Sequence, residues 1–456
     1  MSEDRNDLLS TWARLVEGEP NATALVEAAE NRVWTRKELD EASREWADRV
    51  SDPALLEGAG VGFALPNNAT WFAAYLGLLR CGAVPIPLDS SEPLENQRAL
   101  AAAGGARFVW NGATLETLEG AGTRFPADTC VVKLTSGTTG TPRALAFKHR
   151  EMLADGRQIC ATMSIRPSDT NLAIVPFGHS YGLGNLVVPL LDQGTSAICV
   201  SAPLPHAIAA DAAKWKPTIF PAVPALLRVL ALSALDPKTF ESVRTVVSAG
   251  SALSADVANQ FYQKYHAPVH GFYGSSETGG ISYDRSGEAT LAGRSVGQPM
   301  EGVRIVPAAG QRFWVESAAV YTRKNAARRT AGGHGRFRPA DRGELDARGE
   351  LVLLGRAGRM LKIAGRRIDL TELEQSLRKI SGIRDAYVVP HPHKTEELAA
   401  ALATDFSIEA ARTVIRAALA AWKVPRRILV FHEFPLTSRG KTDTASLREA
   451  LGKTGL

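Results

Sequence analysis

Three short segments of this chain carry residue types that could act on a nucleotide. The first, KLTSGTTGTPR at 133–143, follows an apolar stretch and is expected to precede a helix. Backbone N–H groups and hydroxyls in such a loop can surround phosphate oxygens, and the strand–loop–helix setting favours an anion. Arg143 could add a positive charge and bind a phosphate through two N–H groups of its guanidinium. The segment predicts a phosphate loop rather than a plain Ser/Thr/Gly surface loop. Its residues are Thr135, Ser136, Gly137, Thr138, Thr139 and Gly140.

The second segment is GFYGSSETGG at 271–280. Tyr273, expected at a strand end, could stack on a base, and Glu277 could hold a magnesium ion on ATP phosphates. The alternative is a hydrophilic turn. The third is LTSRGKTD at 436–443, where Lys441 follows a glycine. Alone, such a lysine near a chain end is usually a solvated loop residue.

Other motifs with related chemistry are excluded by their spacing. A Walker A motif fails because Pro142 stands five residues after Gly137 and no Gly-Lys-Ser/Thr follows. A GxSxG hydrolase elbow fails because Gly274 is followed by Ser-Ser-Glu. The glycines from Gly58 onward do not complete a dinucleotide fingerprint, since its sixth position is Phe63.

The elements that must position these segments alternate between strand and helix up to about residue 300. Expected strands lie at 61–65, 82–87, 130–134, 171–176, 196–200, 218–220, 245–248 and 269–273. Expected helices lie at 35–50, 70–79, 147–163, 206–214, 224–232 and 255–265, the first with Thr35 as its N-cap. This rhythm predicts an α/β fold with a large N-terminal domain of parallel-rich sheets flanked by helices.

The pattern changes after about residue 300. Short strands are expected at 303–306, 312–316 and 351–354, then helix 370–380, strand 384–389, helix 407–421 and strand 427–431. This order predicts a small α+β C-terminal domain. We place the domains at 1–355 and 356–456.

Charge is unevenly distributed along the 456 residues, whose net charge is +5. Between Arg342 and Leu456 there are 20 Lys and Arg against 14 Asp and Glu, so the last quarter carries the whole excess. Such a surface could meet an anionic partner, such as the phosphates of coenzyme A or an acidic carrier protein, or it could be a solvated face. The sequence has no basic run interleaved with aromatic residues, so a nucleic-acid partner is not indicated.

The cysteines and the apolar runs indicate a cytoplasmic protein. Four cysteines without CxxC spacing are expected to be buried thiols. The polar start does not resemble a secretory signal, and no uncharged apolar run predicts a membrane span.

Taken together and in order, the three segments resemble the superfamily of acyl-CoA synthetases, peptide-synthetase adenylation domains and luciferases. TSGTTGTPR at 135–143 resembles its phosphate loop, YGSSE at 273–277 its Tyr-Gly-x-Thr-Glu motif, and PLTSRGKTD at 435–443 its C-terminal lysine loop. Gly355-Arg356 and KIAGRRIDLTELE at 362–374 resemble the segment after its hinge. The resemblance implies an AMP-forming ligase that uses ATP and Mg²⁺.

The resemblance also assigns roles. The catalytic residues would be Lys441, which bridges the carboxylate and the α-phosphate, Glu277, which holds magnesium, and His179. The ATP site would comprise the loop residues 135–140 with Ser248, Ala249, Gly250, Phe272, Tyr273, Gly274, Ser275, Ser276, Asp341 and Arg356. A lysine and a metal ion there would stabilise the charge that develops when a carboxylate attacks a phosphate.

A second half-reaction is implied, in which a pantetheine thiol attacks the acyl-adenylate. The small domain would rotate near 356–359, bringing Gly365 to a thiol tunnel in place of Lys441. The sequence departs from the family at Arg143, where lysine is usual, and at Gly358, which replaces a hinge Asp or Lys.

The acid is expected to contact PFGHSYGLGN at 176–185 and to touch His179, Tyr181, Ala249 and Gly274. This segment has no Asp to pair an α-amine, which argues against an amino acid. Aromatic acids and medium- or long-chain fatty acids stay open, since Tyr181 could bond a phenolic hydroxyl or line an apolar tunnel. Also open are CoA or an acyl carrier protein as acceptor, an acyl-AMP ligase that does not use free CoA, and a non-catalytic adenylate-binding homologue.

Overall fold

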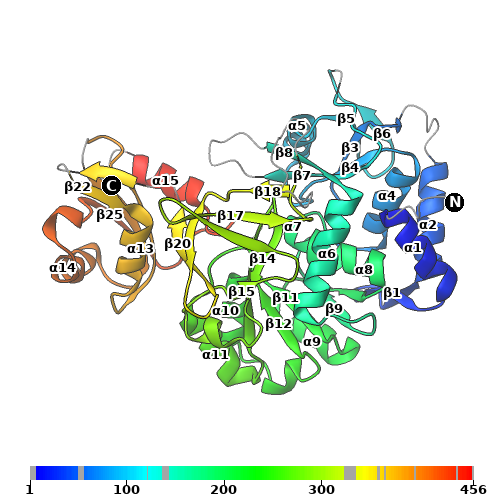
Figure 1. Cartoon of the computed structure of the whole chain (residues 1–456). Coiled ribbons are helices and arrows are strands. Elements are labelled where there is room, and N and C mark those ends of the chain that lie inside the picture. The colour runs from blue at the N-terminus through cyan, green and yellow to red at the C-terminus, as the bar shows by residue number, and fades with distance from the viewer. Residues whose placement is uncertain are drawn as a thin grey trace. The chain divides into compact units, whose positions relative to one another are not determined.

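The computed structural model describes residues 7–49, 56–120, 122–135, 143–322, 335–356, 360–363, 366–394, 397–437 and 440–453 (Figure 1). The chain divides into two compact units. The larger comprises Met1–Val306, Trp314–Arg338 and Asp346–Leu351, and the smaller comprises Pro307–Phe313, Pro339–Leu345 and Val352–Leu456. The domain boundary between residues 355 and 356 stays a prediction.

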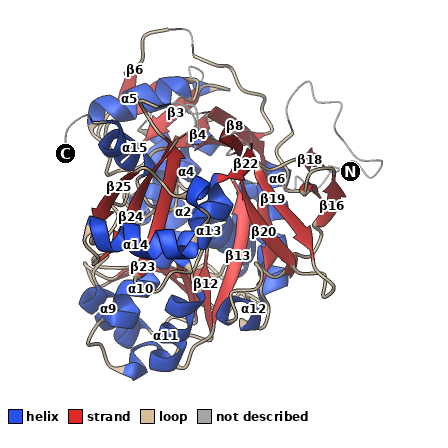
Figure 2. Ribbon diagram, turned by 90° about the vertical axis from the view of Figure 1, so that its left-hand side faces the viewer, coloured by secondary structure: helices blue, strands red, loops and turns tan. Residues whose placement is uncertain are grey.

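A nine-stranded sheet forms the centre of the larger unit (Figure 2). Its strands from β13 to β1 are parallel, and β14, β15 and β2 add antiparallel edges. Their order is β15 (Gln298–Pro299), β14 (Gly279–Tyr283), β13 (Val269–Ser275), β12 (Thr245–Ser248), β11 (Ile219–Ala222), β9 (Thr170–Ala173), β10 (Ser196–Cys199), β1 (Thr23–Glu27) and β2 (Arg32–Thr35).

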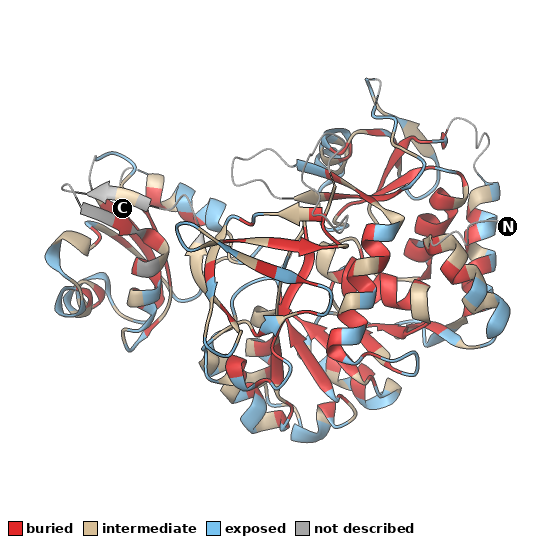
Figure 3. Ribbon diagram, viewed as in Figure 1, coloured by how far each residue is buried: buried red, intermediate tan, exposed pale blue. Residues whose placement is uncertain are grey.

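Helices cover both faces of this sheet, so its parallel strands are buried (Figure 3). Successive strand residues alternate between two cores: Ala197 belongs to the core with α6 (His149–Met163) and α8 (Val188–Gln193). The next residue, Ile198, belongs to a separate core. That second core also includes residues of α9 (Pro205–Trp215), α10 (Pro224–Leu232) and α11 (Ala255–Tyr265).

A second sheet and a hairpin complete the frame of the larger unit. The sheet has the order β4 (Val84–Pro87), β3 (Gly60–Phe63), β5 (Ala106–Trp110) and β6 (Leu115–Thr117). The hairpin pairs β7 (Thr129–Thr135) with β8 (Arg143–Lys148). The helices of this region are α1 (Leu8–Gly18), α2 (Arg36–Asp48), α4 (Ala69–Arg80) and α5 (Leu94–Ala103). Thr35 caps α2 as expected, in a capping box with Glu38.

Strand β8 corrects one expectation about the phosphate loop. Residues 143–148 were expected to be loop and the start of a helix, but they pair antiparallel with β7, and α6 begins only at His149. Leu145 and Phe147 are buried while Ala144 is exposed, which is the two-residue period of a strand. The loop therefore joins two strands, and the argument from a helix N-terminus does not apply to it.

The smaller unit is an α+β arrangement. Its three-stranded sheet has the order β23 (Ile383–Pro390), β24 (Leu398–Thr404) and β25 (Arg427–Phe431), with helices α13 (Leu370–Arg378), α14 (Ile408–Ala418) and α15 (Thr444–Gly452). The central strand β24 was missed because its sequence, LAAALAT, is rich in alanine, which favours helix. All of its residues are buried, so tertiary packing overrides propensity.

The remaining elements are short. They are α7 (Ser180–Gly182), the π-helix η1 (Leu183–Val187), η2 (Pro237–Phe240), α12 (Glu288–Leu291), β16 (Arg304–Ala308), β17 (Arg312–Ser317), β18 (Gly335–Phe337), β19 (Asp341–Leu345), β20 (Leu351–Arg356), β21 (Met360–Ile363), β22 (Arg366–Asp369) and η3 (Ala421–Lys423). The predicted α/β class, with a large N-terminal and a small C-terminal domain, is confirmed.

The four cysteines are buried and unpaired, as expected. Burial raises the pKa of Cys160 to about 12, so this thiol is inert at neutral pH. Within the ranges that the structure describes, no helix is long and apolar enough to cross a membrane.

Candidate active site

The strand order of the main sheet reverses beside β9, and several predicted site residues lie at that point. The chain passes from β9 to β10 on one side and later returns to β11 on the other. In open α/β sheets, ligands bind at the carboxyl ends of the strands where the order reverses. His179 follows β9, Ser248 ends β12, and Phe272 lies in β13, so these strands bring distant sequence segments to one edge.

Tyr181 and Phe272 form an aromatic contact at this edge. Their ring centroids are 5.9 Å apart with an interplanar angle of 42°. The Tyr181 hydroxyl donates to the Val247 carbonyl oxygen at 3.0 Å, and burial raises the pKa of the phenol well above its ordinary value. Its proton is thus used by the backbone of β12. The ring, rather than the hydroxyl proton, remains for a ligand.

His179 faces a carboxylate that is not among the predicted site residues. Its Nε2 atom lies 3.5 Å from Oδ2 of Asp89, which follows β4, and the Asp89 side chain is only 8% exposed. The other Asp89 oxygen accepts from the amide and hydroxyl of Ser91 at 2.9 and 2.6 Å. The imidazole of His179, with these Ser91 contacts, holds the pKa of Asp89 well below its ordinary value, against the effect of burial. The run GAVPIPLD was the available signal.

The predicted base- and metal-binding segment is a β-hairpin. Strand β13 carries Tyr273 and Gly274, and a bulge in its pairing with β14 falls between them. A Cβ atom on Gly274 would lie 2.5 Å from the carbonyl oxygen of Gly279, so only glycine fits there. Ser275, like Tyr273, belongs to this strand and is half-buried.

The turn that follows carries Glu277 and is held from two sides. The Ser180 hydroxyl donates to the Ser276 hydroxyl at 3.1 Å, which joins the turn to the start of α7. The Tyr321 amide donates to the Glu277 carbonyl oxygen at 2.9 Å. Both contacts lie within the larger unit and fix the backbone from which the half-buried Glu277 side chain extends.

The segment after β12 supplies the other predicted nucleotide contacts. Ser248 is buried, and its hydroxyl has no hydrogen-bond partner among the residues that the structure describes. The Ala249 amide donates to the Ala222 carbonyl oxygen at 3.2 Å, which ties this segment to β11. Gly250 is exposed with φ +92°, a backbone angle that favours glycine.

Of the predicted phosphate loop, the structure describes only its two ends. Thr135 ends β7 and pairs in register with Arg143, the first residue of β8. Ser136, Gly137, Thr138, Thr139 and Gly140 lie outside the described residues. Arg143, an exposed residue, therefore stands at the base of the loop rather than within it.

Lys441 lies in the smaller unit, in a tight turn before α15. The Thr437 amide donates to the Lys441 carbonyl oxygen at 2.7 Å, and the Lys441 amide donates to the Thr437 hydroxyl at 3.3 Å. Asp443 then caps α15 through bonds from the Ala445 and Ser446 amides at 3.0 and 3.1 Å. These bonds give an exposed lysine a defined backbone.

Four predicted site residues remain, namely Asp341, Arg356, Gly358 and Gly365. Asp341 begins β19 in the smaller unit and is half-buried. Arg356 ends β20, and its side chain is not among those described. Gly358 and Gly365 lie outside the described residues.

Few acidic side chains lie close enough together to bind a metal ion in the described part of the chain. No group of three His, Cys, Asp or Glu side chains within the described ranges could hold a metal ion. A single carboxylate such as Glu277 fits Mg²⁺, because this ion usually takes one or two carboxylates and completes its shell with substrate phosphates and water.

The fold is thus α/β, and several predicted site residues lie at the switch point of its parallel sheet. The AMP-binding enzyme family matches residues 12–123 and 121–312, and the AMP-binding enzyme C-terminal domain matches residues 372–441. The chain belongs to the AMP-binding enzyme family and is an AMP-forming acid–thiol ligase.

Two relatives and one solved structure illustrate the likeness. The chain is 26% identical to the 3-hydroxybenzoate–CoA/4-hydroxybenzoate–CoA ligase of Thauera aromatica, across 96% of each chain. It is 29% identical to the p-hydroxybenzoic acid–AMP ligase of Mycobacterium tuberculosis, across 69% of this chain and 48% of that protein. The ATP-bound MatB of Rhodopseudomonas palustris has the same fold, with a TM-score of 0.82, 20% identity, and coverage of 97% and 98%.

Proposed function

We propose that this enzyme activates an aromatic carboxylic acid of the benzoate type and passes the acyl group to the thiol of CoA. The observation that carries the proposal is the pair of rings of Tyr181 and Phe272 at the carboxyl edge of the main sheet, 5.9 Å apart. Such rings offer an apolar, planar surface that suits an aryl group. The names of the two curated relatives support the same class of acid.

An α-amino acid is a poor candidate despite the carboxylate of Asp89. One Asp89 oxygen accepts two bonds from Ser91, and the other faces His179. An ammonium group would have to displace the imidazole from this buried carboxylate. Without such a partner, a buried ammonium is unfavourable.

For adenylation, the proposed roles follow the chemistry of bringing two anions together. Glu277 would hold Mg²⁺ against the ATP phosphates, and the metal ion would neutralise phosphate charge. The hydroxyls and amides after Thr135 would hold the phosphates. Lys441 would stabilise the charge that develops as the carboxylate attacks the α-phosphate. Proper placement of these charges suffices, and the reaction needs no covalent intermediate on the protein.

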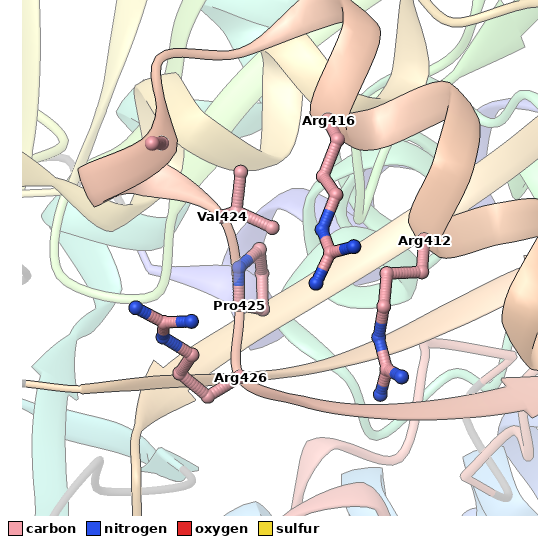
Figure 4. A pocket seen from close by; sticks show the side chains of 6 residues that line it. Arg412, Arg416, Val424, Pro425 and Arg426 are labelled. Atoms are coloured by element: carbon pink, nitrogen blue, oxygen red, sulfur yellow. The ribbon is translucent and has the colours of Figure 1, made fainter.

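For thiol transfer, a cationic pocket in the smaller unit suits an anionic acceptor. Arg412, Arg416 and Arg426 line a cavity of about 490 Å³, together with Ala421, Val424 and Pro425 (Figure 4). Arg412 is paired with Glu409 at 3.2 Å, while Arg416 and Arg426 are exposed. Guanidinium groups bind phosphate through paired N–H donors, so this pocket would contact the phosphates of CoA.

The adenylation test is acid-dependent pyrophosphate release with MgATP and a panel of benzoates and fatty acids. Lys441→Ala should lower kcat about a hundred- to a thousand-fold, the usual effect of removing one transition-state donor. Lys453→Ala is the matched control, because this exposed lysine in the same unit pairs with Glu449 across one helical turn. Release with fatty acids alone would refute the aromatic assignment, and equal activity of both variants would refute the role of Lys441.

The acceptor test compares CoA with pantetheine, which has the same thiol but no nucleotide phosphates. Arg416→Gln should raise the KM for CoA about tenfold and leave the KM for pantetheine unchanged. The exposed Lys394→Gln in the same unit serves as control. No CoA-dependent product with any acid would point instead to an acyl-AMP ligase that serves a carrier protein.

A further inference from the structure

A buried lysine lies near the end of β7, two residues before Thr135, and no role has been assigned to it above. Lys133, on β7, is 3% exposed. Its ammonium has no hydrogen-bond partner in the described part of the chain, and Nζ lies 4.0 Å from the ring centroid of Phe147 on β8. A desolvated cation–π contact offsets part of the cost of burying the ammonium. Burying an ammonium costs several kcal/mol, so this contact alone does not balance the charge.

Carboxylates on two further elements act electrostatically on Lys133. Burial lowers the pKa of Lys133, whereas the charges of Asp155, Glu151 and Glu277 raise it. Asp155 and Glu151 stand one helical turn apart on α6, so their side chains share a helix face. The negative charges that act on the cation therefore come from that helix and from the turn that carries Glu277.

Hydrogen bonds connect Asp155 and Glu151 of α6 to the turn that carries Glu277 and to the neighbouring segment at Tyr321. Oδ1 of buried Asp155 accepts from the Gly280 amide at 2.9 Å, and a Cβ atom on Gly279 would lie only 2.2 Å from the same oxygen. Glu151 accepts from the Thr322 hydroxyl, next to Tyr321, whose amide donates to Glu277. The backbone that follows Glu277 is therefore bonded to Asp155, and the Glu277 carbonyl oxygen is bonded to the segment whose Thr322 contacts Glu151.

The strand period connects the same lysine to the phosphate loop. Side chains two residues apart project from the same face of a strand, so Lys133 and Thr135 share one face of β7. Thr135 is half-buried at the point where the loop begins.

We propose that Lys133 is a positioning residue for MgATP, whose ammonium, held between Phe147 and Asp155, fixes the Glu277 turn relative to the start of the phosphate loop. The inference rests on the proposed function, since it takes Glu277 and the loop to bind the metal ion and the phosphates. Without the cation, Asp155 would be a buried carboxylate with no counter-charge, and it would protonate or turn away from Gly280.

The experiment measures the Kd for MgATP by calorimetry, together with steady-state kinetics. Lys133→Met should raise the Kd and the KM for MgATP at least tenfold and leave the KM for the acid unchanged. Lys133→Arg should restore the Kd to within about threefold, because it keeps the charge. Phe261→Leu is the control for destabilisation alone. Phe261 is fully buried beside Tyr265, with ring centroids 4.8 Å apart, and should lower Tm without changing the Kd.

If Lys133→Met does not fold, Asp155→Asn is the second variant. It keeps an acceptor for the Gly280 amide and removes the carboxylate that faces Lys133, so it should raise the Kd in the same direction. An unchanged Kd in a folded Lys133→Met or Asp155→Asn variant overturns the inference, as does wild-type protein that binds no MgATP. Wild-type protein that binds MgATP but releases no pyrophosphate with any acid refutes the proposed function and leaves the binding test of Lys133 intact.

Discussion

Replacing Tyr181 by phenylalanine separates two ways in which this residue could contribute to acid selection. The Tyr181 hydroxyl donates to the Val247 carbonyl oxygen at 3.0 Å, so its proton is already used within the protein. The variant keeps the ring against Phe272 and loses the contact of the hydroxyl with the backbone. We therefore expect a loss of stability with no loss of selectivity between 4-hydroxybenzoate and benzoate.

The size of the stability effect follows from the kind of bond removed. A neutral hydrogen bond contributes about 1 kcal/mol net. In domains of 150–250 residues such a change lowers Tm by about 2–4 °C, and the larger unit should show about 2 °C. Tyr265→Phe is a matched control, because its buried hydroxyl also donates to a carbonyl oxygen, that of Leu230, at 2.8 Å. It should lower Tm by a similar amount.

The selectivity assay is pyrophosphate release, analysed as the ratio of kcat/KM for 4-hydroxybenzoate to kcat/KM for benzoate. We expect the same ratio in wild type, Tyr181→Phe and Tyr265→Phe. If the Tyr181 hydroxyl instead bonded a phenolic substrate, its loss would lower the ratio about tenfold, the equivalent of 1.4 kcal/mol. A tenfold fall in Tyr181→Phe alone would refute our interpretation of the hydrogen bond to Val247.

Two further predictions test the site backbone and the contact between Asp89 and His179. Gly274→Ala should raise the KM for MgATP at least tenfold, because its Cβ atom would lie 2.5 Å from the Gly279 carbonyl oxygen. Gly18→Ala is the control and should leave the KM unchanged, since there is open space around Gly18. Unchanged kinetics for Gly274→Ala would contradict this prediction. Asp89→Asn should destabilise the protein at neutral pH, because the imidazole of His179 lowers the pKa of Asp89. A carboxyl group whose pKa is lower in the folded than in the unfolded state stabilises the fold at pH values above its unfolded pKa of about 3.9. This contribution is lost as the pH falls through the folded pKa. Urea unfolding of both proteins should therefore give a free-energy difference that shrinks below about pH 4. A constant difference would contradict the lowered pKa of Asp89.

Local sequence determined the elements whose signals lie within a few residues. Thr35 caps α2 because its partner Glu38 is three positions away, and α10 (Pro224–Leu232) has the predicted bounds because proline starts it. The nucleotide motifs can also be recognised from local sequence, since unbroken runs of Gly, Ser and Thr are typical of loops and not of cores. These features need no knowledge of the rest of the chain.

Only the tertiary structure decided features that depend on distant partners. Strand β24 is alanine-rich and becomes a strand because β23 and β25 flank it on both sides. Asp89 joins His179 across 90 positions of sequence, and the Tyr181 hydroxyl finds a carbonyl on β12, which no local pattern can encode. In the sequence, Lys133 is a single residue that shortly precedes the predicted phosphate loop. Its burial among carboxylates from α6 and from the Glu277 turn exists only once these elements pack together, because electrostatic interactions depend on distance and burial rather than on order along the chain.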